Sequence, residues 1–495
     1  MAAPIQDVQR KPTNGISVLV AGAGIGGLMT ALECWRQGCD VRILERTKTT
    51  ITTGDSFSIG HTATSYFRYW PQMQKENREI AYRPMMAYHT PTGERIKGPL
   101  PFHSILSKKT SNGGEYIEVF RHSRPKFHAM LLRQLNRIGI QVEYDCPVAE
   151  YFEDAETDRA DVVLKNGRRI EADLVVAADG GRSSSWSLIA GHPVPARSSG
   201  SAIFRAAYDV NLALADPMIA ERFPLLEDGS SVVELWVGHG TLSPVFWRNK
   251  DEMTWAIMHP DDGSAEESWG KPVLPADVLK WTAQIADWPE VANRVINCTP
   301  PANLIDWKLM FRDPQPTWTS PKTSRVVQLG DAAHMFLPSS GNGGTQAIED
   351  AVSLAACIHC AGRKANIPHA TRIHNLLRFE RVSCLQALGV ANQAKMKTKT
   401  APSRPQPQHE NGKVNGDDTV DKKGLKLHLG KWIIEHEPEQ YAYDNYAAAA
   451  RHLSQGSEFK NTNTPPGMVY RPWTIDTLLE AQARGEPTVL DGDWE

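Results

Sequence analysis

The sequence has 495 residues, a net charge of -3 and a pI near 6.6. A chain of this length exceeds one simple core and predicts two or three structural units. A net charge so close to zero gives no electrostatic reason to expect a nucleic acid or an anionic membrane as a partner. The N-terminus lacks a signal-peptide pattern, and the longest apolar run is too short and too rich in glycine for a transmembrane segment. We therefore expect a cytoplasmic protein.

The seven cysteines are scattered, and their odd number is typical of a reducing compartment rather than of a disulfide framework. Cys357 and Cys360 form a C-x-x-C motif, but they lie in an apolar, helix-like run without a second cysteine pair. We expect these two thiols to pack in the core rather than to bind metal or perform redox chemistry. The sequence has no H-E-x-x-H motif, so no metal site is predicted.

The first organised stretch is a strand, a glycine-rich turn, a helix and a second strand. Residues 18–21 predict a buried strand, residues 28–37 a helix, and residues 40–44 another strand. The turn between the first two elements, GAGIGG at residues 22–27, fits the pattern G-x-G-x-x-G. Such a turn brings phosphates onto the N-terminus of the helix, where free N–H groups and the helix dipole favour negative charge.

Each glycine of this motif has a separate expected role. Gly22 permits the tight turn, Gly24 lets the backbone approach a pyrophosphate, and Gly27 allows the helix to pack closely on the strand. Glu45, about twenty residues further on, is placed to accept hydrogen bonds from a ribose. The unit therefore predicts a dinucleotide site, although the motif alone does not separate FAD from NAD(P).

The later elements are predicted from hydrophobic periodicity. A helix beginning at Arg124 has one apolar face, and a buried strand at residues 173–178 ends in Asp179 and Gly180. Strands are also predicted at residues 83–88, 115–120, 140–144 and 323–329, as a meander at 147–172, and as several segments within 200–260. Helices are predicted near residues 65–70, 274–297, 430–453 and 474–484. Residues 401–423 are polar and contain proline, which predicts a disordered or mobile loop.

Three separated segments carry a resemblance to a known family. They are the glycine-rich unit, DLVVAADGGRSSS at residues 173–185, and GDAAHMFLPSSGNGGTQAIEDAVSLA at residues 330–355. In this order they resemble the single-component FAD-dependent aromatic hydroxylases of the salicylate- and p-hydroxybenzoate-hydroxylase type. The sequence is most similar to the fungal enzymes of natural-product pathways. The resemblance covers nearly the whole ordered chain and includes the C-terminal WIIEHEPEQYAYDNY.

The resemblance implies an α/β fold, in which a Rossmann-like FAD-binding domain is interleaved with a mixed β-sheet substrate domain and followed by a helical C-terminal region. It assigns residues 15–78, 115–195 and 320–400 to the FAD-binding domain, and 79–114 and 196–319 to the substrate-binding domain. Residues 1–14 are expected to form a flexible arm, 401–424 a disordered loop, and 425–495 a C-terminal helical region and tail.

The resemblance also implies roles for individual residues. Those expected to hold the AMP half of FAD are Gly22, Gly24, Ile25, Gly27 and Glu45, with Arg46 beside the same ribose. Arg124 is expected to reach the ribose or pyrophosphate, and Asp331 the ribitol. Asp179 and Gly180 match a motif that links FAD and NAD(P)H binding. The loop beside the isoalloxazine ring comprises Pro338, Gly341, Asn342, Gly343 and Gly344.

The residues alone leave plainer interpretations open. Asp331 is also suited to cap a helix, and Asp179-Gly180 to form a turn at a strand end. His334 is better explained by a structural role than by a catalytic one. The family commonly has glutamine where this chain has Asn342 and asparagine where it has Thr345, which puts the contacts to the flavin pyrimidine in question.

The implied reaction uses NADPH or NADH and O₂ to hydroxylate or epoxidise an electron-rich aromatic, polyketide or terpenoid-type substrate through a flavin C4a-hydroperoxide. A basic group near a phenol would favour the phenolate, and His239, Arg205 and His61 are the candidates. One alternative is an FAD-dependent oxidative rearrangement or cyclisation, and another is a non-oxygenating flavoprotein. The substrate and the choice between monomer and homodimer stay open.

Overall fold

The glycine-rich unit lies at the centre of a five-stranded parallel sheet. The computed structural model describes residues 8–50, 54–101, 120–237, 242–266, 271–399, 430–484, 486 and 491–494. The order in this sheet is β17-β11-β1-β2-β7. Its strands are β1 (Ser17–Ala21), β2 (Asp40–Leu44), β7 (Val142–Glu143), β11 (Leu174–Ala177) and β17 (Val326–Gln328). Because β1 and β11 pair in register from Val18↔Leu174 to Ala21↔Ala177, the loops that follow these two strands meet at one edge.

Both faces of the parallel sheet are covered, as expected for parallel strands rich in valine and leucine. One face packs against α1 (Ile25–Arg36), α4 (Arg124–Arg137) and α10 (Gly343–Ala361) in the main hydrophobic core. The other face packs against a small antiparallel sheet of β8 (Val148–Asp154), β9 (Arg159–Leu164) and β10 (Arg169–Ala172). The short helix α5 (Trp186–Ile189) follows β11.

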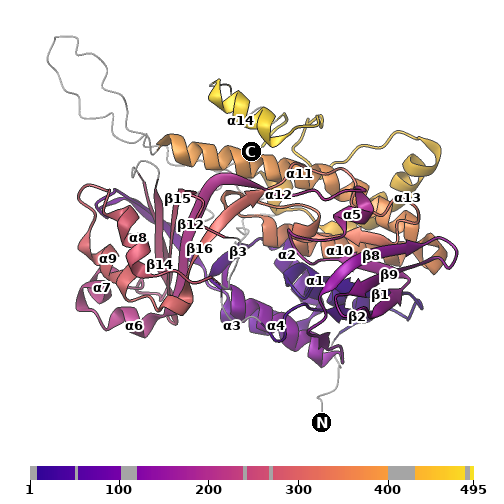
Figure 1. The fold of residues 1–495 in the computed structure, drawn as a ribbon, viewed down its shortest axis with the longest axis horizontal. Helices are drawn as coiled ribbons and strands as arrows, with labels where there is room; N and C mark the ends of the chain where they lie inside the picture. The colour runs from indigo at the N-terminus through magenta and orange to yellow at the C-terminus, as the bar shows by residue number, and fades with distance from the viewer. Residues whose placement is uncertain are drawn as a thin grey trace.

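A second, seven-stranded sheet forms the other half of the molecule (Figure 1). Its order is β16-β12-β15-β14-β13-β4-β5, and all neighbours are antiparallel except β13 and β4. The strands are β4 (Pro84–His89), β5 (Arg95–Pro101), β12 (Arg197–Asp209), β13 (Ser231–Trp236), β14 (Ser243–Arg248), β15 (Glu252–Pro260) and β16 (Leu304–Phe311). Its apolar face packs on α6 (Val210–Leu214), α7 (Pro217–Arg222), α8 (Pro275–Thr282) and α9 (Glu290–Asn297). The turn η3 (Pro301–Asn303) precedes β16.

A short connecting layer lies between the two sheets. Strand β3 (Ser56–Ile59) pairs antiparallel with β6 (Phe120–Ser123). It leads into α2 (His61–Thr64), η1 (Ser65–Tyr69) and α3 (Pro71–Ile80). In Figure 1 β3 lies between the seven-stranded sheet and the helices that cover the five-stranded parallel sheet.

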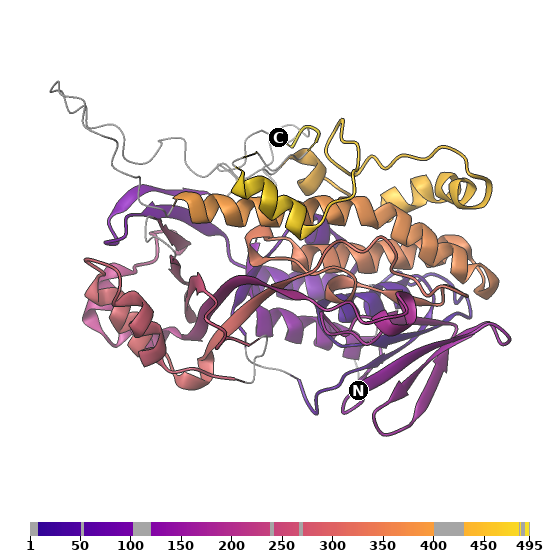
Figure 2. The same cartoon turned by 45° about the horizontal axis from the view of Figure 1, so that its top comes forward.

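The C-terminal part is helical. Two short turns, η4 (Gly330–Ala332) and η5 (Pro338–Ser340), precede α10, and η6 (Lys364–Asn366) leads into α11 (Ile367–Lys399). The remaining helices are α12 (Lys431–Ile434), α13 (Pro438–Gln455) and α14 (Ile475–Ala483). Figures 1 and 2 show α11 running along the molecule with α14 lying against it. None of the helices in the described ranges is both long and apolar enough to cross a membrane.

The predicted fold class is confirmed: a Rossmann-like unit, a mixed second sheet and a helical C-terminal region are all present. The apolar face expected for α4 is buried, and Cys357 lies in the main core. Helix α1 begins at Ile25, three residues before its predicted start, because the last glycines of the turn already adopt helical geometry. The predicted loop at 401–423 and most of the predicted strand at 115–120 lie outside the described residues.

Candidate active site

The glycine-rich turn leaves space in front of helix α1. Gly22 has φ +109°, and a Cβ there would lie 2.3 Å from the carbonyl oxygen of Ala178. A Cβ on Gly27 would lie 1.9 Å from the carbonyl oxygen of Gly22, so Gly27 is needed for packing within the turn itself. A Cβ on Gly24 would meet nothing within 4 Å. Gly24 therefore faces open space at the N-terminus of α1, where a diphosphate fits.

Glu45 holds the turn from the next strand. Its Oε2 accepts the N–H of Ala23 at 2.9 Å, and its Oε1 accepts the N–H of Thr47 at 2.9 Å. Each carboxylate oxygen has a further lone pair, so the same group can also accept ribose hydroxyls. Arg46, the next residue, is exposed and lies close enough to Asp179 to lower the pKa of that carboxyl.

Asp179 lies beside Gly22, because β11 and β1 are adjacent parallel strands. Its Oδ2 accepts a hydrogen bond from the hydroxyl of Tyr151 at 2.8 Å, while its Oδ1 is buried without a partner among the described residues. Burial raises the pKa of Asp179. Gly180, with φ +87°, then turns the chain away from the strand.

Arg124 is the first residue of α4. Its backbone N–H bonds to the carbonyl oxygen of Asp55 at 2.8 Å, and its guanidinium lies 4.8 Å from the ring centroid of Phe57. The Nε atom is buried and has no hydrogen-bond partner within the described part of the chain. Desolvation lowers the pKa of this guanidinium. A guanidinium with a buried, unpaired N–H group fits an anionic ligand oxygen.

Asp331 faces the same space from the end of β17. Its side chain is solvent-accessible, yet the surrounding protein desolvates the carboxyl enough to raise its pKa, against the charges of His334, Arg124 and Arg312. Arg124 and Asp331 thus interact electrostatically although they come from α4 and η4. A cation and a carboxylate around one open space suit a ligand with both phosphate and hydroxyl groups.

The loop from Pro338 to Gly344 presents the N-terminus of α10. Gly341 has φ +63°, and Asn342 folds its side-chain amide back onto the carbonyl oxygen of Ser340 at 2.6 Å. No side chain caps the helix, so the N–H groups of Gly343 and Gly344 are not used by a cap. A Cβ on Gly344 would lie 3.0 Å from Ile59, which places β3 directly against this helix end.

Thr345 joins this loop to the connecting layer. Its Oγ1 accepts the N–H of Gly60 at 2.9 Å. Thr345 stands where the family commonly has asparagine, and its side chain has a defined backbone partner in Gly60. A free helix N-terminus can stabilise negative charge on a bound ring.

The three candidates for the basic group have different surroundings. Arg205 on β12 forms an ion pair with buried Asp55, with Nε 2.8 Å from Oδ2. His61 begins α2, is exposed and lines a cavity of about 860 Å³, and desolvation lowers its pKa. His239 lies outside the described residues. Asp55 therefore connects Arg205 to Arg124, because its side chain pairs with Arg205 and its carbonyl oxygen accepts the N–H of Arg124. His61 instead follows Gly60, whose N–H bonds to Thr345.

A buried ion network lies behind the site and was not predicted. Asp350 on α10 accepts the N–H of Gly330 at 3.1 Å and contacts Nε2 of His334 at 2.6 Å. Arg378 on α11 bonds to Asp350 at 2.8 Å and to Glu349 at 2.7 Å. The nearby cations hold the pKa values of both carboxyls well below their usual range, against the effect of burial. Asp350 thus positions Gly330 and, through it, Asp331.

The comparisons with known proteins agree with this geometry. The family model described as "FAD binding domain" matches residues 15–366, so the chain belongs to the FAD-binding-domain family. Among curated relatives, the chain is 40% identical over 493 residues to the FAD-dependent monooxygenase fsr3 of Gibberella fujikuroi, covering 98% of this chain and 91% of that protein. It is 39% identical over 498 residues to the FAD-dependent monooxygenase mdpD of Emericella nidulans, with the same two coverages. The chain thus belongs with the FAD-dependent monooxygenases, and it is an oxidoreductase.

Solved structures show the same architecture. The crystal structure of CtdE in complex with FAD and substrate 4 matches with a TM-score of 0.75 and 26% identity, covering 89% of this chain and all of that chain. The salicylate hydroxylase substrate complex matches in fold with a TM-score of 0.63 at 20% identity, over 90% of this chain and all of that one. The predicted family resemblance is therefore confirmed.

Proposed function

We propose that this protein uses NAD(P)H, O₂ and bound FAD to hydroxylate or epoxidise an electron-rich aromatic intermediate of fungal natural-product synthesis. Two observations carry the cofactor part: the open space in front of Gly24, which we call the cradle, and the buried, unpaired Nε of Arg124 on α4. The relatives' activity and the FAD-bound CtdE structure support the reaction class. The cofactor, when bound, supplies the activation of oxygen.

The proposed cofactor contacts follow the geometry of the cradle. The diphosphate lies at the N-terminus of α1 beside Gly24, and Glu45 accepts hydrogen bonds from the adenosine ribose. Arg124 and Asp331 bind the central part of FAD from two sides. The open N-terminus of α10, at Gly343 and Gly344, carries the partial positive charge that favours an anionic reduced ring.

The remaining assignments concern the substrate. Arg205 forms an ion pair with Asp55, and the arginine side chain offers only hydrogen-bond donors, so we assign it to attracting an anionic oxygen rather than to removing a proton. His61 suits proton acceptance, because desolvation favours its neutral form. His239 remains a further candidate. We assign residues 79–114 and 196–319 to the substrate-binding part and residues 15–78, 115–195 and 320–400 to the FAD-binding part.

The first test is the visible spectrum of purified protein, followed by anaerobic addition of NADPH or NADH with and without a panel of phenolic substrates. We expect a yellow protein that a nicotinamide bleaches and air recolours. Product mass then distinguishes one added oxygen atom from a rearranged or cyclised product. A colourless protein that takes up no added FAD would contradict the proposal, and so would a flavin that neither nucleotide reduces with any substrate present.

A further inference from the structure

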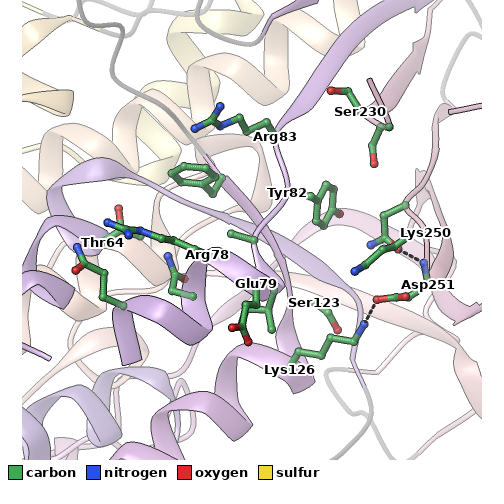
Figure 3. Close-up of a pocket in the computed structure, with 18 of the residues that line it drawn as sticks. Thr64, Arg78, Glu79, Tyr82, Arg83, Ser123, Lys126, Ser230, Lys250 and Asp251 are labelled. Atoms are coloured by element: carbon green, nitrogen blue, oxygen red, sulfur yellow. Dashed lines mark hydrogen bonds and ion pairs between the residues drawn. The ribbon is translucent and has the colours of Figure 1, made fainter. Parts of the chain in front are cut away.

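A cavity of about 860 Å³ lies between α2 and α3 on one side and the ends of the second sheet on the other (Figure 3). This volume is within the roughly 300–1,000 Å³ typical of small-molecule sites. One end of the cavity is lined by His61. The preceding residue, Gly60, donates its N–H to the hydroxyl of Thr345 in the first turn of α10. The other end reaches the turn at Lys250 and Asp251 between β14 and β15. The cavity therefore begins one residue after the contact between Gly60 and Thr345 and ends at the β14–β15 turn.

The lining of this cavity is polar and carries four cations against three carboxylates, although the whole chain has a net charge of -3. Lys126 and Asp251 neutralise each other in an ion pair of 2.8 Å. The side chains of Arg78 and Lys250 are exposed and make no hydrogen bond or ion pair with other described residues. Figure 3 shows them on opposite sides, Arg78 beside Thr64 and Lys250 beside Asp251, with Arg83 on a third side.

Neutral donors complete the lining. Thr64, Ser230 and Ser231 line the cavity with hydroxyl groups, and the Oγ atom of Ser65 is buried without a partner in the described ranges. Large apolar groups are few, since Tyr82, Phe120 and Ile80 are the main ones. A flat apolar substrate would leave these charges desolvated and unpaired, which is costly. The lining fits a hydrophilic anion with ring systems.

We propose that this cavity binds NADPH, with Arg78 and Lys250 as phosphate-binding residues. The inference rests on the proposed function, because it places the cosubstrate of that reaction. Separated cations suit a ligand whose diphosphate and 2′-phosphate lie apart, and NADH lacks the second of these groups. Arginine and lysine are the side chains that bind phosphate through charge-assisted hydrogen bonds.

The test is equilibrium binding of NADP⁺ to the FAD-loaded protein by calorimetry, for wild type, R78Q, K250Q and the double variant. Each lost charge-assisted hydrogen bond should weaken binding about tenfold. The FAD content should stay at the wild-type level in every variant, because neither residue contacts the cradle. K75Q is the matched control, since Lys75 is exposed on the same helix α3 and does not line the cavity. It should bind NADP⁺ as wild type does.

Stopped-flow reduction gives a second readout. The apparent Kd for NADPH should rise in R78Q and K250Q, while the limiting rate of flavin reduction stays within about twofold. Wild-type binding of NADP⁺ by both variants would overturn this site while leaving the proposed function intact. A wild-type protein that binds no NADP⁺ and is reduced by NADH alone would also overturn it. Failure of both nucleotides to reduce the wild type would instead contradict the proposed function together with this site.

Discussion

Single residues of the cofactor cradle have separable roles. Gly27 is required because its hydrogen occupies a position where a methyl group would meet the carbonyl oxygen of Gly22, whereas Gly24 faces empty space. Glycine is thus needed at Gly27 for the fold, whereas at Gly24 the proposed function assigns it to the ligand. The sequence motif likewise predicts packing for Gly27 and close approach to a pyrophosphate for Gly24.

We expect Gly24→Ala to fold normally and to bind FAD at least tenfold more weakly, because the added methyl group projects into the ligand space. Gly24 has φ −70°, which alanine adopts without strain. Gly27→Ala should lower both the melting temperature of the apoprotein and FAD binding, since overpacking costs about 1–3 kcal/mol. Thermal unfolding without FAD and fluorescence titration with FAD check these outcomes. Equal loss of apoprotein stability in both variants would contradict them.

Buried histidines predict the acid sensitivity of the fold. Burial lowers the pKa of His374 to about 3 and that of His122 to about 3, so both are neutral in the folded protein. In the unfolded chain they take up protons below about pH 6.5. The contribution of these neutral histidines to the free energy of unfolding is therefore fully present above pH 6.5. It decreases as the pH falls from 6.5 toward 3, by up to about 1.4 kcal/mol per pH unit for each histidine.

We expect His374→Gln to reduce the slope of unfolding free energy against pH between pH 6 and 5 by about 1 kcal/mol per unit. Urea unfolding at saturating FAD measures this slope. His369→Gln is the control, because His369 is exposed on the same helix. An unchanged slope in His374→Gln would show that His374 does not stay neutral in the folded protein.

At the scale of elements, helix α11 packs against the segment from Met335 to Gly344, which precedes and begins α10. Gln386 donates to the carbonyl oxygen of Met335 at 2.9 Å, and the hydroxyl of Ser339 donates to the carbonyl oxygen of Gly389 at 2.7 Å. A Cβ on Gly389 would lie 3.0 Å from Cβ of Ser340. The loop that presents the N-terminus of α10 is therefore held by a helix more than forty residues further along the chain.

We expect Gln386→Leu and Gly389→Ala to weaken FAD binding several-fold. The first leaves a buried carbonyl group unpaired, at a cost of about 1–3 kcal/mol, and the second displaces Ser340. FAD titration measures the effect. Gln284→Leu, at an exposed position after α8, is the control and should bind FAD normally. Wild-type affinity in both α11 variants would show that the loop holds its shape without α11.

The elements also show how far the sequence can predict this fold. The unit β1-α1-β2 was predictable because its periodicity and its glycines are local. Helix α3 was not predicted, since its sequence PQMQKENREI is mostly polar and only Met73 and Asn77 are buried. The Asp55–Arg205 pair was also missed, because the two residues are 150 positions apart. The buried ion network could have been predicted from Glu349 and Asp350, which are charged residues within an apolar helix. Carboxylates buried in such a helix require cationic partners.

At the scale of the whole molecule, Arg381 joins the C-terminal region to the cofactor half. Its guanidinium bonds to Glu349 at 2.9 Å and to the carbonyl oxygens of Trp432, Ile433 and Asn463 at 2.6, 3.0 and 3.0 Å. Glu349 in turn accepts the hydroxyl of Thr62 beside the cavity at 2.7 Å. One buried cation thus connects α11, α10, α12 and the segment after α13.

We expect Arg381→Met to destabilise the protein by about 3–5 kcal/mol, because it leaves the buried carboxylate of Glu349 with one cation fewer. Hydrogen exchange of residues 431–463 should become faster than in wild type, beyond the general loss of stability. Arg451→Met, at an exposed position of α13, is the control. Unchanged exchange in that segment would show that Arg381 does not hold it.

The strand order also has a consequence for synthesis on the ribosome. Strand β11 ends at residue 177, but its outer neighbour β17 begins at residue 326. At a translation rate of about 5–20 residues per second, β17 is synthesised on the order of ten seconds after β11, and the outer edge of β11 stays unpaired for that time. During that time a hydrophobic strand edge is open to pairing with other nascent chains. A high expression level, which raises the concentration of nascent chains, should therefore increase the insoluble fraction of this protein. Co-expression of chaperones that bind exposed strand edges during translation should increase the soluble yield.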